Sequence, residues 1–168
     1  LPKAVTVSDQ KSENMIFAQP DRSHEEETMT GITLTATGGC LCGAVRYRIL
    51  GAMRGVVNCH CSKCRRIHGN FGAYTSVALD QLQFDEKRGL KWFHSTTDET
   101  PNVYRGFCFE CGSSLFWHPR DRERISVSAG SLDAPEHLKT IGHVWISQKS
   151  GYYDILDELP KHWQGWQQ

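Results

Sequence analysis

Three cysteines in the run "NCHCSKCRRIHG" are spaced as metal ligands. Cys59, Cys61 and Cys64 lie within six residues of one another. A catalytic zinc ion commonly takes three protein ligands and keeps a fourth position open for water or substrate. Three sulfurs without a nearby fourth ligand therefore predict a metal site with one exchangeable position.

The other cysteines suit a closed, structural site. Cys40 and Cys42 form a CxC pair in "GGCLCGAV". In an extended segment, residues i and i+2 face the same side, so both sulfurs can reach one ion. Cys108 and Cys111 form a CxxC pair that resembles a zinc knuckle, and Gly112 can take the positive φ that such a turn needs. Together the two pairs supply four thiolates for a tetrahedral zinc.

A different pairing of the cysteines is also compatible with the spacing. The CxxC at 61–64 can join the CxxC at 108–111 in a zinc ribbon. The gap of 43 residues between them is longer than usual for a ribbon, and the remaining three cysteines are left over. Spacing alone therefore favours the first grouping but leaves the second open.

Basic residues surround the three-cysteine run. Three thiolates on Zn²⁺ carry a net charge of −1, which Lys63, Arg65 and Arg66 can offset. The same residues can receive an anionic substrate, although a solvated surface explains Arg65 and Arg66 equally well.

The sequence offers two histidines as acid–base candidates and a third that lies among the cysteines. His60 lies between two of the ligands and should point away from the metal in an extended strand. His68 and His143 are acid–base candidates, but a structural or surface role is the commoner one for a histidine.

Composition excludes several classes of protein. The chain has 168 residues, enough for one domain, and equal numbers of basic and acidic residues, 19 of each. This balance argues against a nucleic-acid-binding protein. No apolar run is long enough for a membrane span or a secretion signal, and no glycine-rich loop suggests a nucleotide cofactor. An odd cysteine count of seven disfavours a disulfide framework, so we expect a reducing, cytoplasmic setting.

The chain divides into an N-terminal arm, residues 1–30, and a domain, residues 31–168. The arm is polar and acidic, and the apolar segment 15–17 is its expected anchor. Alternating patterns in the domain predict a mainly β, antiparallel fold with little helix. The expected strands are 32–37, 44–50, 71–79, 90–95, 102–107, 114–119, 124–132 and 143–148, with helical turns at 64–68 and near 134–138.

Five motifs, in order, carry a resemblance to a known family: "TGGCLCGAVRY", "NCHCSKCRRIHG", "FCFECGSSLFW", "ISVSAGSLD" and "HVWISQKSGYYDI". They resemble the glutathione-dependent formaldehyde-activating enzyme family, which includes the centromere protein V group. The resemblance implies a β-tent fold and two zinc ions. It implies a structural zinc on Cys40, Cys42, Cys108 and Cys111, and a catalytic zinc on Cys59, Cys61 and Cys64.

The resemblance also implies an activity. It points to a zinc-dependent carbon–sulfur lyase or synthase that acts on the adduct of a thiol, such as glutathione, and an aldehyde. The alternatives are a zinc enzyme of the same fold with another substrate, or a non-catalytic binding protein. The expected partner is a small molecule, with a homodimer left open.

Two segments depart from the family pattern. Asn70 and Phe71 stand where a small residue or proline is more usual, and Tyr152 and Tyr153 stand where a tryptophan is frequent. Both segments are expected to shape the substrate pocket.

Overall fold

The computed structural model describes residues 36–166, and the arm and the start of the first expected strand lie outside this range. The described chain is mainly β, as predicted. Its strands are β1 (Ala36–Gly39), β2 (Arg46–Ile49), β3 (Val56–Cys59), β4 (Gly72–Ala78), β5 (Leu82–Glu86), β6 (Leu90–Ser95), β7 (Val103–Cys108), β8 (Ser114–Pro119), β9 (Arg124–Ser128) and β10 (Thr140–Val144). One α-helix, α1 (Ser62–His68), follows β3, and three short 3₁₀ turns cover Leu79–Gln81, Ala129–Ser131 and Ile146–Gln148.

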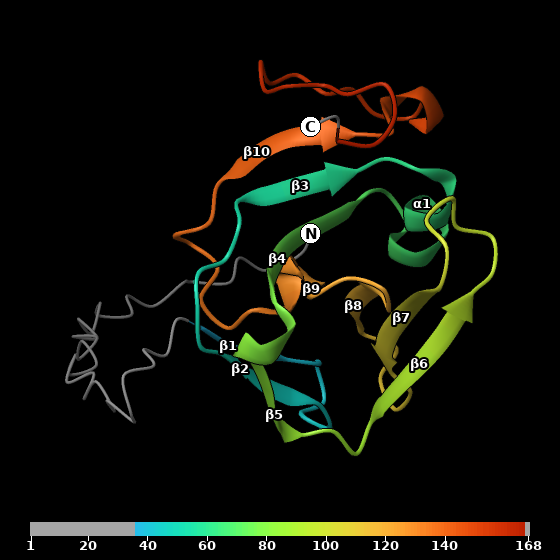
Figure 1. Ribbon diagram of the computed structural model, residues 1–168. Coiled ribbons are helices and arrows are strands. Elements are labelled where there is room, and N and C mark those ends of the chain that lie inside the picture. The colour runs from blue at the N-terminus through green and yellow to red at the C-terminus, as the bar shows by residue number, and fades with distance from the viewer. Residues whose placement is uncertain (1–35, 167–168) are drawn as a thin grey trace, which may run out of the picture.

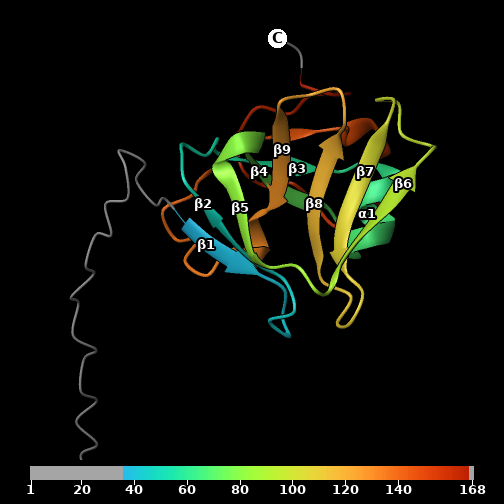
Figure 2. The same cartoon turned by 60° about the horizontal axis from the view of Figure 1, so that its bottom comes forward.

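The strands form two sheets. The smaller sheet has the order β1-β2-β5, and the larger has the order β10-β3-β4-β9-β8-β7-β6. Figure 1 shows the larger sheet curving strongly, with α1 between the end of β3 and the strands β6 and β7 at the far edge. Figure 2 shows the smaller sheet beside it. Neighbouring strands are antiparallel except β3 and β10, which run parallel, so the purely antiparallel expectation was wrong for this pair.

The hydrophobic core joins the two sheets. Tyr47 and Ile49 of β2 are buried with Leu115 and Phe116 of β8, and Val127 of β9 completes the contact. The rings of Tyr47 and Phe116 meet edge to face, with centroids 5.3 Å apart. This packing explains the alternation of "RYRI", because Tyr47 and Ile49 are buried whereas Arg46 and Arg48 are only partly buried.

Most expected elements coincide with observed ones, although the strand expected at 124–132 ends at Ser128 and continues as a 3₁₀ turn. The strands at β6 and β8 match their expected bounds. The short strands β3 and β5 were not expected. The strand expected at 143–148 was wrong beyond Val144, because Trp145 takes a left-handed φ of 60° and the chain turns into a 3₁₀ helix. The segment 134–138 makes a turn and no helix.

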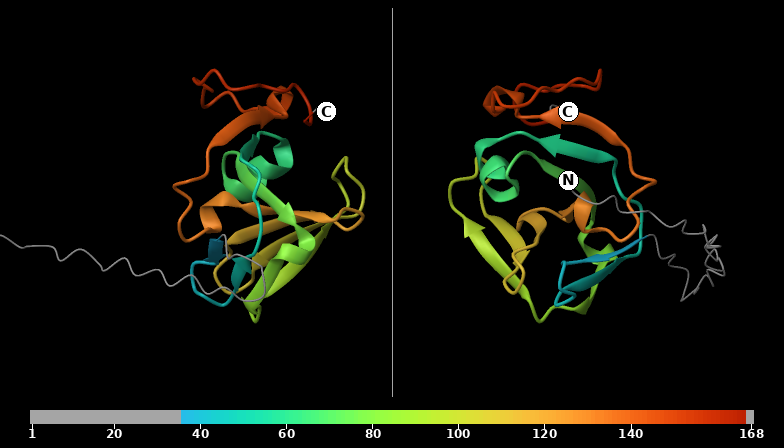
Figure 3. Two further views of the ribbon diagram at one scale, coloured as in Figure 1. Left: turned by 60° about the vertical axis from the view of Figure 1, so that its left-hand side comes forward. Right: turned by 180° about the vertical axis from the view of Figure 1, so that it is seen from behind.

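The C-terminal segment runs along the outer side of β10. Backbone hydrogen bonds join His143 to Pro160 and His162, and Trp145 to Gln164. Figure 3 shows this segment lying over β10 from two further sides. It therefore extends the edge of the larger sheet. Within residues 36–166, no helix has the length and apolar character that crossing a membrane requires.

Candidate functional site

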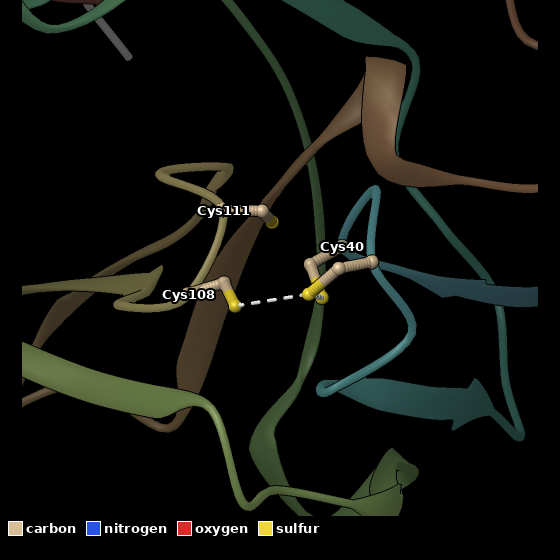
Figure 4. A group of neighbouring side chains, drawn as sticks. Cys40, Cys108 and Cys111 are labelled. Atoms are coloured by element: carbon tan, nitrogen blue, oxygen red, sulfur yellow. Dashed lines mark hydrogen bonds between the residues drawn. The ribbon is translucent and has the colours of Figure 1, made fainter.

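Four sulfurs converge from two turns at one edge of the core. The Sγ atoms of Cys40, Cys42, Cys108 and Cys111 all lie within 4.8 Å of one another. Cys42 is 3.6 Å from Cys40 and 3.8 Å from Cys108, sulfur to sulfur. Figure 4 shows Cys40 on one turn facing Cys108 and Cys111 on the other. The structure thus brings together the four residues of the first grouping, and the zinc-ribbon pairing does not form.

Each of these turns is held by backbone hydrogen bonds. In the first, the Cys40 amide donates to Val45, and the Val45 amide donates back to the Cys40 sulfur at 3.2 Å. In the second, the Gly112 amide donates to the Cys108 carbonyl, and Gly112 has the positive φ, 76°, that the knuckle motif predicted. Such geometry aims the sulfurs at a common point before any ion binds.

The remaining three sulfurs form a second cluster. Those of Cys59, Cys61 and Cys64 also lie within 4.8 Å of one another. Cys59 ends β3, Cys61 is the N-cap of α1, and Cys64 lies in the first turn of that helix. The Cys61 sulfur accepts a hydrogen bond from the Cys64 amide at 3.4 Å, so the helix start itself fixes two of the three sulfurs. The helical turn expected here is therefore present.

The three thiols influence one another strongly. Hydrogen bonds from Cys59 and then Cys64 lower the pKa of Cys61 to about 2. The hydrogen bond with Cys61, together with burial, raises the pKa of Cys59 to about 12. Three thiolates at this separation repel one another, so the cluster suits a bound cation better than three free thiols.

A cavity of about 310 Å³ opens beside the three-cysteine cluster, and Cys59, Cys61 and Cys64 all line this cavity. Its wall combines residues of β3, β4, β7, β8, β9 and β10 with residues of α1, of loops and of the C-terminal segment. The indole rings of Trp117, Trp145 and Trp166 form apolar parts of the wall. Trp117 and Trp145 also pack against the buried cysteines. The arrangement is that of a ligand pocket with an apolar lining and a small reactive centre.

The cavity wall carries more basic than acidic groups. Arg54, Lys63, Arg105 and Arg122 line it, against Asp98 and Glu99. Both acids are already engaged, since Arg105 pairs with Asp98 at 2.7 Å and Lys63 lies 4.0 Å from Glu99. Within residues 36–166, Arg54 and Arg122 have no acidic partner. The excess positive charge complements a negatively charged metal–thiolate centre or an anionic ligand.

The histidines serve the structure behind the cluster. His60 is almost fully buried, and its ring contacts the Tyr153 hydroxyl at 2.5 Å and His143 at 2.8 Å. His143 continues the chain of contacts to Asp157 at 3.0 Å. Burial, and then the proximity of His143, lower the pKa of His60 to about 4. His68 contacts the Tyr74 hydroxyl at 2.8 Å. None of the three is among the residues that line the cavity.

Other expectations about the pocket need correction. Of the three basic residues near the cysteines, Lys63 lines the cavity, whereas Arg65 and Arg66 do not. The segments that depart from the family pattern, 70–71 and 152–153, do not line it either. Phe71 and Tyr153 instead pack around His60.

Sequence reasoning missed Arg54, Arg105 and Arg122, and it assigned no cavity role to the tryptophans. No local signal identifies them, because they come from separate parts of the chain that meet at the cavity only through the topology of the sheet. The alternating pattern of β7 predicted a strand but did not predict that Arg105 is buried.

Comparison with known proteins places the fold and the cysteines in context. Residues 35–148 match the family model described as glutathione-dependent formaldehyde-activating enzyme. A protein of Halomonas elongata, provisionally named a glutathione-dependent formaldehyde-activating enzyme, is 28% identical over 128 residues, covering 70% of this chain and 79% of the relative. A crystal structure of a Rhodobacter sphaeroides protein aligns with 24% identity and a TM-score of 0.48, over 58% of this chain and 88% of that one.

The family model spans more than half of the chain and includes both cysteine clusters. The chain therefore belongs to the glutathione-dependent formaldehyde-activating enzyme family.

Proposed function

We propose that the protein is a zinc-dependent carbon–sulfur lyase or synthase that joins a thiol to an aldehyde, or reverses that step. The observation that carries the proposal is the cluster of Cys59, Cys61 and Cys64 at the wall of a cavity of about 310 Å³. The name of the matched family supports a glutathione-like thiol and an aldehyde as the substrate pair.

The geometry of the sulfurs supports zinc as the metal. Four sulfurs held about 2.3 Å from a tetrahedral zinc ion lie about 3.8 Å from one another. The separations of 3.6 and 3.8 Å in the four-cysteine cluster fit this value. Thiolates favour zinc over magnesium or calcium, which prefer oxygen ligands. We assign the four-cysteine cluster to a structural zinc and the three-cysteine cluster to a catalytic zinc.

The residues around the three-cysteine cluster have separable roles. Cys59, Cys61 and Cys64 would hold the ion, which when bound supplies Lewis-acid chemistry that lowers the pKa of a thiol or polarises a carbonyl. Trp117 and Trp145 exclude water from the cluster, and so strengthen the electrostatic interactions there. Basic side chains of the wall attract an anionic thiol substrate.

The cavity also supports a related candidate, the same chemistry on an aldehyde larger than formaldehyde. Three indole rings line a space that a one-carbon aldehyde would not fill. A substrate with an apolar or planar aldehyde portion would gain contact with these rings.

An assay of the purified, zinc-loaded protein with glutathione and a panel of aldehydes tests both candidates. Faster adduct formation with formaldehyde than with larger aldehydes would support the first candidate, and the opposite order would support the second. Binding of thiols without turnover of any aldehyde would contradict the enzyme proposal and favour a binding protein.

Zinc content provides a separate prediction. We expect two zinc ions per chain by elemental analysis, and removal by a chelator in two phases. The ion on Cys59, Cys61 and Cys64 should leave first, because its fourth ligand is exchangeable. The ion on the four-cysteine cluster should leave only as the domain unfolds, since its binding is coupled to folding. A single zinc that is retained in Cys40→Ser would overturn the assignment.

A further inference from the structure

An ion pair in the cavity wall leaves two of its polar atoms without partners. Arg105 of β7 donates from Nη2 to Oδ1 of Asp98 at 2.7 Å, and the side chains of both residues are at most 10% exposed. Arg105 Nη1 and Asp98 Oδ2 are buried and have no hydrogen-bond partner among residues 36–166. Both residues line the cavity that the three sulfurs share.

A purely structural role does not account for this pair. Burying two charges costs several kcal/mol, which a buried pair recovers only when its remaining donors and acceptors are satisfied. Here a guanidinium donor is left over next to the reactive cluster. Arg105 also stays fully charged: burial acts to lower its pKa, but the charges of Asp98 and then Cys64 raise the pKa above its ordinary value. Such a group is a fixed cation with a buried N–H that no described residue accepts from.

We propose that Arg105 is a further catalytic residue, whose free N–H donor stabilises the oxygen anion of the thiol–aldehyde adduct. This inference rests on the function proposed above. In the synthetic direction the thiolate sulfur attacks the carbonyl carbon, a carbon–sulfur bond forms, and the carbonyl π electrons move onto oxygen. The resulting alkoxide accepts the hydrogen bond from Arg105 and then takes a proton from water. Cleavage follows the same steps in reverse. Because the guanidinium does not deprotonate, Arg105 supplies charge and a hydrogen bond but no proton.

Kinetics with Arg105→Gln test this role. We expect kcat to fall by about 100-fold or more, the usual cost of one lost oxyanion donor, while KM changes little. Arg105→Lys, which keeps the charge without the fork of donors, should recover part of the loss. A rise in KM at constant kcat would overturn the proposal, because it would show a role in substrate binding only. Arg48→Gln serves as the control, since Arg48 pairs with Asp85 on the exposed face of β2.

A binding measurement provides a test that does not depend on turnover. The probes are mercaptoacetate, which carries an anionic oxygen near its sulfur, and 2-mercaptoethanol, which is neutral. Their binding can be followed through the fluorescence of the tryptophans in the wall. We expect the wild-type, zinc-loaded protein to bind mercaptoacetate at least about tenfold more tightly, the coupling expected of a charge-assisted hydrogen bond. Arg105→Gln should lose most of this preference, although the other basic residues of the wall remain.

Asp98→Asn tests whether binding of mercaptoacetate needs only the charge of Arg105 or the intact ion pair between Arg105 and Asp98. The variant keeps the cation of Arg105 and removes the charge of the Asp98 carboxylate, which competes with the probe for that cation. The preference of the variant for mercaptoacetate should therefore persist or grow. Loss of the preference in Asp98→Asn, as in Arg105→Gln, would show that the ion pair has only a structural role, and it would overturn the inference. Equal binding of both probes by the wild type would also overturn it while leaving the proposed function standing. Binding of neither probe would contradict both.

Discussion

Replacing Cys108 by serine is expected to unfold the domain. Cys108 is fully buried at the end of β7 and belongs both to the four-sulfur cluster and to the main core. A structural zinc site contributes about 10–16 kcal/mol in zinc-finger peptides, as much as the whole stability of an ordinary domain. A serine hydroxyl is a poor replacement for a thiolate ligand. Far-UV circular dichroism and elemental analysis should show loss of strand structure and of both zinc ions.

A folded Cys108→Ser protein with two zinc ions would contradict the assignment of a structural site. Cys42→Ser is the matched variant, because Cys42 comes from the other turn of the same cluster and is exposed, outside the core. Agreement between the two would show that both turns contribute to one ion. If only Cys108→Ser unfolds, the core packing of that side chain is the cause rather than the metal.

Cys61→Ser is expected to abolish turnover and leave the fold intact. The N-cap position of Cys61 tolerates serine, which is among the preferred N-cap residues, so α1 should still form. The cluster would keep two thiolates, too few to hold a catalytic zinc tightly. Activity should fall by well over about 100-fold, the upper cost of losing only an outer-shell partner of a metal. The zinc content should fall from two ions to one.

The measurement is activity and circular dichroism on the same preparation, with Cys108→Ser beside it. Full activity in Cys61→Ser would refute the catalytic role of the three-cysteine cluster. The non-catalytic binding protein would then be the better hypothesis.

The sequence predicted the features that local spacing encodes. CxC and CxxC pairs restrict their sulfurs to one side of a turn, so the pairs could be anticipated, and Gly112 marked the turn of the pair Cys108 and Cys111. Spacing left the grouping of the pairs open, and the family resemblance supplied it. Strands such as β6 and β8 were recognised because several alternating residues support each of them. β3 has only four residues, three of them buried, and therefore lacks an alternating pattern.

The cavity could not be predicted in the same way. Arg54, Arg105 and Trp166 meet there because the strand order of the larger sheet brings β3 and β7 to one cavity and the C-terminal segment runs along β10. These are contacts between distant parts of the chain, and no motif records them. The position of Trp145 further depends on its left-handed backbone, an arrangement unusual for a bulky residue.

The cysteine clusters and part of the cavity wall come from different stretches of the chain. All seven sulfurs lie before Gly112, whereas Trp145, Gly165 and Trp166 reach the cavity from the last stretch of the chain, by way of β10 and the segment along it. Substitutions after Thr140 can therefore change the size and polarity of the cavity without altering a cysteine of either cluster. Relatives of this protein can in this way diverge in the molecules they accept while keeping the same reactive centre.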